Sequence, residues 1–69
     1  MKLSARNQFA GTVTAIKRGP VNSQISVDIG GGNTVVSMIT TDAADALGLA
    51  EGGQATVVIK ASEVMLATA

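Results

Sequence analysis

Two short segments near the ends of the chain each combine a cation with a hydroxyl. Near the beginning, Ser4 and Arg6 stand two positions apart, and near the end Lys60 and Ser62 have the same spacing. Residues two apart in an extended chain point the same way, so each segment can present its cation and hydroxyl together. If folding brings the ends together, within one chain or between neighbouring subunits, two positive charges and several small donors surround a space suited to a dianion. This chemistry predicts binding, not catalysis.

Either motif alone is a weak signal, because Lys and Arg are ordinarily solvated surface charges. The chain has only five Lys and Arg among its 69 residues, however, and two of them lie in otherwise apolar or small-residue stretches at its two ends. This scarcity favours the anion site.

The inventory of reactive side chains argues against an enzyme. There is no Cys and no His, so a nucleophile and base would have to be Ser or Thr with Lys60, or paired carboxylates. The acids are scattered over expected turns, a helix cap and outward strand positions: Asp28, Asp42, Asp45, Glu51 and Glu63. We therefore expect a non-enzyme with no catalytic cofactor and no bound metal cation.

Charge and aromatic content argue against nucleic-acid and membrane partners. The net charge is zero, 14% of residues are charged, and Phe9 is the only aromatic residue. Nucleic-acid binding normally needs a basic surface, and single-strand binding needs several stacking platforms. No apolar run approaches a membrane span and the N-terminus lacks the layout of a secretory signal, so we expect a cytoplasmic protein.

Size and hydropathy predict an oligomer. A chain of this length buries only about 60% of its unfolded surface, so a monomer is marginally stable. The mean hydropathy is nevertheless +0.39 and 46% of residues are apolar. Subunit interfaces are the simplest place for this excess apolar surface.

Hydrophobic alternation predicts mostly strands. The expected strands cover residues 3–14, with the pattern continuing toward Ile16, and residues 24–29, 34–40 and 54–61. Residues 62–67 are expected to form a last short strand or a continuation of the strand before them. A loop is expected at 17–20, a turn at 30–33 and one short helix at about 42–47, capped by Thr41 or Asp42 and closed by Gly48. Inward faces are assigned to Phe9, to Ile25, Val27 and Ile29, and to Ala55, Val57 and Ile59. The glycines at 30–32 do not form a phosphate loop, since the lysine and helix of that motif are missing.

This layout predicts an all-β fold, a small five-stranded Greek-key barrel of the oligonucleotide/oligosaccharide-binding (OB) type. Seven stretches carry a resemblance to a known family: 1–8 (MKLSARNQ), 11–13 (GTV), 21–22 (VN), 27–33 (VDIGGGN), 47–49 (LGL), 51–52 (EG) and 59–65 (IKASEVM). Together they resemble the molbindins, single Mop-domain (Mop/TOBE type) molybdate-binding proteins, from Met1 to Ala67. The resemblance implies that residues 1–69 form one Mop domain.

What the family does is implied by this resemblance alone. Molbindins are cytoplasmic homohexamers, trimers of dimers, that store molybdate or tungstate at subunit interfaces for molybdenum homeostasis. Carried over to this sequence, the interface site comprises Ser4, Ala5 and Arg6 of one subunit with Thr40, Lys60, Ala61 and Ser62 of a neighbour. A second site falls in the loop that contains Gly19, Val21 and Asn22. Ala43 stands where some relatives have serine, so that donor is lost or supplied by Thr41.

The sequence allows alternatives to oxyanion storage. The chain could be an oxyanion sensor, or a generic small-barrel module that acts through a protein or nucleic-acid partner. A pterin ligand is disfavoured, because a flat ring needs an aromatic or carboxylate partner and Phe9 is assigned to the core. Molybdate and tungstate are tetrahedral dianions of nearly equal size, so the sequence does not separate them.

Overall fold

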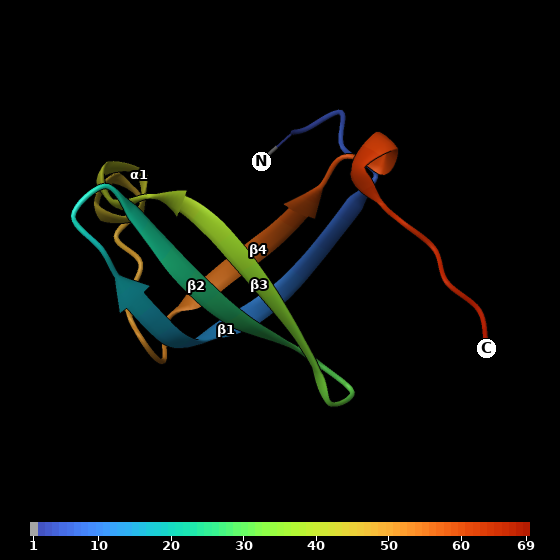
Figure 1. Ribbon diagram of the computed structural model, residues 1–69, viewed down its shortest axis with the longest axis horizontal. Coiled ribbons are helices and arrows are strands. Elements are labelled where there is room, and N and C mark those ends of the chain that lie inside the picture. Colours follow the sequence, from blue (N-terminus) through green and yellow to red (C-terminus); the bar gives the residue numbers. More distant parts are fainter. Residues whose placement is uncertain (1) are drawn as a thin grey trace.

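The computed structural model describes residues 2–69, and four strands form one antiparallel sheet. They are β1 (Asn7–Arg18), β2 (Asn22–Gly30), β3 (Asn33–Thr40) and β4 (Gln54–Ile59), in the spatial order β3-β2-β1-β4. The fourth strand returns to lie beside the first, which is the Greek-key arrangement. Figure 1 shows that the sheet is strongly curled. The prediction of an all-β Greek-key fold with one short helix is confirmed.

The predicted fifth strand at residues 62–67 is wrong. Ala61–Glu63 form a single 3-10 turn, η1, and the chain then runs away from the sheet to the C-terminus (Figure 1). Apolar residues such as Met65 and Leu66 suit a strand, but a strand needs a neighbouring edge to pair with. In residues 64–69 the chain leaves the sheet and meets none, so these two side chains are 92% and 93% exposed.

The first strand is longer at one end and shorter at the other than the pattern predicts. It begins at Asn7, and it includes Lys17 and Arg18, which were expected in a loop. These two residues pair with Gln24 and Ser23 of β2, so backbone pairing continues where the side chains are polar. Gly11 permits a close approach of β1 to β2, since a Cβ there would lie 2.5 Å from a backbone oxygen of β2.

The expected turn and helix are present. The turn at 30–32 has positive φ at all three glycines, and Gly48, with φ +66, follows the helix as expected. The helix, α1 (Thr41–Ala46), begins one residue earlier than predicted. Its cap is Thr40 instead of Thr41 or Asp42, because the Thr40 side chain accepts a hydrogen bond from the Ala43 amide at 3.1 Å.

The core is small and lies inside the curl of the sheet, under α1. Its fully buried apolar members are Val13, Ile25, Val27 and Ala44. The inward assignments on β2 and β4 are confirmed, since these residues are buried or half-buried. The inward assignment of Phe9 is wrong: its side chain is 40% exposed, because residues 7–10 lie where β1 has only β4 as a partner and the core does not reach them.

The two edges of the sheet, β3 and β4, face each other without pairing in the part of the chain that the structure describes. Between them lies a cleft of about 260 Å³. Its walls are mainly aliphatic and include Ile25, Ile39, Leu49 and Val57. The barrel is therefore open along one side of this chain.

Candidate functional site

Pairing of β1 with β4 builds a concavity at one end of the sheet. The two strands run antiparallel with Asn7 opposite Ile59, the first residue of β1 and the last of β4. The segment that enters β1 and the segment that leaves β4 must therefore lie side by side. In Figure 1 the N-terminal segment and η1 meet at this end.

This concavity has a volume of about 620 Å³ and is lined by residues of both segments. The lining residues are Ser4, Ala5, Arg6, Val58, Lys60, Ala61 and Ser62. Six of the seven residues assigned to the interface site from sequence therefore lie around one space within a single chain. Lys60, Ala61 and Ser62 were expected to come from a neighbouring subunit, but the pairing of β1 with β4 places them beside Ser4, Ala5 and Arg6 of the same chain. Val58 was missed because it occupies an outward position on β4, and outward apolar residues carry no signal for a ligand.

The two segments do not reach this arrangement as extended strands. Residues 2–6 belong to no strand, and Lys60 is followed by the 3-10 turn η1. The expectation that residues two apart share a face therefore does not apply here. The antiparallel register of β1 and β4 is what brings the two cations to one end of the sheet.

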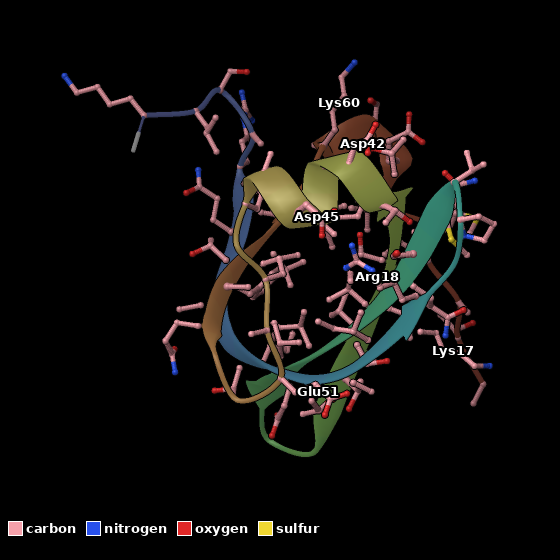
Figure 2. All side chains as sticks on the ribbon, turned by 90° about the vertical axis from the view of Figure 1, so that its left-hand side faces the viewer. Lys17, Arg18, Asp42, Asp45, Glu51 and Lys60 are labelled. Atoms are coloured by element: carbon pink, nitrogen blue, oxygen red, sulfur yellow. The ribbon has the colours of Figure 1, made fainter. Side chains whose placement is uncertain are left out.

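The positive charges of the concavity have no carboxylate partner. Within residues 2–69 the one ion pair joins Arg18 to Asp45, at 2.6 Å, near α1. Figure 2 shows that pair beside the helix, whereas Lys60 extends away from the sheet. No acid lines the concavity, so Arg6 and Lys60 are both available to an anion.

Two side-chain amides tie the walls of the concavity in place. Asn7 Nδ2 donates to the carbonyl oxygen of Ile59 at 3.2 Å, and Gln8 Nε2 donates to that of Ala5 at 2.9 Å. Sequence reasoning gave these amides no role. The available signal was their place at the start of β1, directly after the candidate residues.

Thr40 does not line this concavity. It caps α1, where its hydroxyl oxygen accepts a hydrogen bond from the Ala43 amide. A neighbouring subunit would have to bring it to the anion. Its contribution stays a prediction.

The loop assigned to the second site is tightly held by Thr41. The amide of Thr41 donates to the Val21 carbonyl at 2.8 Å, and its hydroxyl donates to the Gly19 carbonyl at 2.7 Å. The hydroxyl of Ser23, which is fully buried, bonds to the same Thr41 oxygen at 2.7 Å. Asn22 is exposed beside this network. The structure thus explains the shape of the loop, and anion binding by Gly19, Val21 and Asn22 stays a prediction.

No group of three or more His, Cys, Asp or Glu side chains that could hold a metal ion occurs between residues 2 and 69. Across the same residues, no helix has the length and apolar character needed to cross a bilayer.

Curated relatives match nearly the whole chain. A probable molybdenum-pterin-binding protein of Haemophilus influenzae is 46% identical, with 96% of each chain covered. The molybdenum transport protein ModE of Herbaspirillum seropedicae is 50% identical over 68 residues, and the chain spans only 25% of that protein.

Solved structures match equally well. MopII from Clostridium pasteurianum has a TM-score of 0.91 and 39% identity, with 97% of this chain and 100% of that one covered. A molybdate-binding protein from Sporomusa ovata has a TM-score of 0.91, 35% identity and coverage of 99% and 100%. The cytoplasmic molybdate-binding protein ModG, in a form with molybdate bound, has a TM-score of 0.89 and 45% identity, with 94% of this chain and 46% of that one covered.

The TOBE domain model matches residues 3–66, which includes both walls of the concavity. Since the match extends over almost the entire length of single-domain relatives, the chain belongs to the TOBE domain family and, within it, to the molybdenum-pterin-binding proteins.

Proposed function

We propose that the concavity at the β1–β4 end binds a tetrahedral metal oxyanion, molybdate or tungstate. The observation that carries this proposal is the meeting of Arg6 and Lys60, without a carboxylate, in one space lined by small residues. Two positive charges match a dianion, and the hydroxyls of Ser4 and Ser62 supply short donors. The amides of Ala5 and Ala61 can approach closely because their side chains are small. A molybdate-bound form of the related ModG supports this choice of ligand.

The role we propose is storage for molybdenum homeostasis in the cytoplasm, by one Mop domain of residues 1–69 that catalyses no reaction. The chain offers charge and hydrogen-bond donors but no His or Cys. Relatives with similar sequences are named for binding or transport, and ModG is described as cytoplasmic. A nucleic-acid partner is disfavoured by the zero net charge and single aromatic residue.

The assembly we propose is a homohexamer, a trimer of dimers, with Thr40 supplied to the site by a neighbouring subunit. The support is the apolar surface that one chain leaves uncovered. Phe9, Met38, Met65 and Leu66 are all exposed, and the cleft between β3 and β4 is open. Burial of such surface is the usual driving force for obligate association.

A hexamer is therefore the expected species at micromolar concentration. Native mass spectrometry of the purified protein should give six chains, and the mass of any bound oxyanion appears in the same spectrum. Sedimentation equilibrium provides an independent check of the subunit count. A folded monomer with no larger species in both measurements would contradict the hexamer and the contribution of Thr40.

Anion selectivity tests the proposed ligand. A ring of fixed donors spaced for long metal–oxygen bonds leaves the smaller sulfate with unmade hydrogen bonds, which cost about 1–3 kcal/mol each. Phosphate is partly protonated at neutral pH, and a site of donors has no acceptor for that proton. We expect calorimetric titration to show tight binding of molybdate and tungstate and binding at least about 10-fold weaker for sulfate.

Competition experiments can contradict the proposed storage of a metal oxyanion. Displacement of micromolar molybdate by millimolar sulfate would exclude a dedicated metal-oxyanion store. A single-stranded oligonucleotide or a pterin that binds more tightly than molybdate would favour a generic binding module or a pterin carrier.

A further inference from the structure

The segment that carries Arg6 is held by Gln8. Residues 2–6 belong to no strand, so no strand pairing fixes them. Gln8 Nε2 instead donates to the Ala5 carbonyl at 2.9 Å. That carbonyl belongs to the peptide group whose N–H is that of Arg6. Because a trans peptide is planar, the Gln8 bond orients the whole peptide group that leads into this cation.

The segment that carries Lys60 is held in the same way by Asn7. β4 ends at Ile59, so regular strand pairing stops one residue before Lys60. Asn7 Nδ2 donates to the Ile59 carbonyl at 3.2 Å, in a half-buried position. This bond orients the peptide group between Ile59 and Lys60. One consecutive pair of amides thus acts on both cationic walls.

We propose that Asn7 and Gln8 are positioning residues of the oxyanion site, with Gln8 acting through Arg6 and Asn7 acting through Lys60. This inference rests on the proposed function. Neither amide lines the concavity, so neither is assigned a contact with the ligand. Their effect is to keep the two charged walls at a fixed separation.

Fixed separation matters most for discrimination between anions of different size. Donors must hold their places to within roughly 0.5 Å to favour one ligand geometry. A wall released from its amide bond can move inward and contact sulfate as well as molybdate. Loss of either amide therefore lowers molybdate affinity and, to a larger extent, the ratio of molybdate to sulfate affinity.

The test uses Gln8→Met, which keeps the length of the side chain without its donor, and Asn7→Ala. Gln54→Ala is the matched control, because Gln54 Nε2 makes an exposed hydrogen bond to Thr12, at 3.4 Å, at the other end of the same β1–β4 ladder. Titration of each full-length variant with sodium molybdate should give Kd values roughly 3- to 10-fold higher for the first two and unchanged for the control. The molybdate-to-sulfate ratio should fall only in the first two.

A double-mutant cycle separates positioning from a general effect on the fold. In the Arg6→Ala background, Gln8→Met should change Kd by less than about 2-fold, because the group through which it acts is gone. In the Lys60→Ala background it should keep its full effect. Equal effects in both backgrounds, or an equal loss in Gln54→Ala, would overturn the inference.

The inference and the proposed function fail in different ways. Unchanged Kd and selectivity in Gln8→Met, with tight molybdate binding by the unmodified protein, would overturn the positioning role alone. No molybdate binding by the unmodified protein would overturn both. If Asn7→Ala does not fold, as judged by circular dichroism, Gln8→Met decides the outcome, since Gln8 is exposed.

Discussion

Replacement of Arg6 or Lys60 by alanine is expected to weaken molybdate binding by roughly 30-fold to several thousand-fold. The proposed site offers two positive charges to a dianion, and no third cation lines it to compensate for the loss of one. Truncation of one partner of a charge-assisted contact in a partly desolvated site costs about 2–5 kcal/mol, which corresponds to that range. Isothermal titration calorimetry at constant ionic strength measures the change directly.

Lys17→Ala is the matched control for these two variants. Lys17 is exposed on β1, and its replacement by alanine removes the same formal charge from the chain as the replacement of Arg6 or Lys60. Arg18 is unsuitable, because its replacement would also break the ion pair with Asp45. If Lys17→Ala weakens binding as much as Lys60→Ala, the anion responds to the total charge of the protein and not to the concavity.

Replacement of Ile25 by alanine is expected to lower the free energy of unfolding by about 2–5 kcal/mol. Ile25 is 2% exposed and belongs to a fully buried apolar core of four residues. A core this small has few other contacts to compensate, and the aliphatic walls around Ile25 lose part of their packing. Urea denaturation followed by circular dichroism, at one fixed protomer concentration, gives the value.

Ile25→Val is the reference for this measurement. It removes one methylene group and should cost only about 0.5–1.5 kcal/mol. A cost for Ile25→Ala below that of Ile25→Val would mean that the core inside the curl does not govern stability.

Much of the fold could be predicted because the strands carry a strict alternation. On β2, alternate apolar residues such as Ile25 and Val27 face inward as expected, and the glycine turn at 30–32 follows directly. The helix position was also predictable, since a run of small residues is followed by Gly48 in the sequence. In the structure this glycine has the expected positive φ, +66. Such signals are local, and local signals are what a sequence displays.

The wrong predictions concern features that depend on contacts between distant parts of the chain. Residues 62–67 have suitable side chains for a strand, but no strand edge lies beside them in the sheet. Phe9 fits the alternation of apolar and polar residues along β1, but the core does not extend as far as Phe9, so its side chain is exposed. Both outcomes depend on where the sheet curls and ends, and alternation contains no information on either.

The candidate site was also predictable only in part. Its residue types could be selected from sequence because cations are scarce, but the reason for their meeting is the pairing of Asn7 with Ile59. The spacing of Ser4 and Arg6 along an extended chain does not contribute to this meeting, since residues 2–6 form no strand. The roles proposed for Asn7 and Gln8 depend on side-chain hydrogen bonds, for which the sequence gives no signal beyond their place directly after the candidate residues.

The placement of charge gives this electrically neutral chain one positive end. Arg6 and Lys60 line the concavity without a carboxylate, whereas at the α1 end of the sheet Arg18 is paired with Asp45. Figure 1 shows that α1 and the concavity lie at opposite ends of the sheet. A dianion in solution is drawn toward the positive end before it makes any contact. Added salt screens this attraction over about 10 Å, so it slows capture of the anion far more than it hastens escape. A neutral protein can in this way gather a dilute anion without the excess positive charge that would also attract nucleic acids.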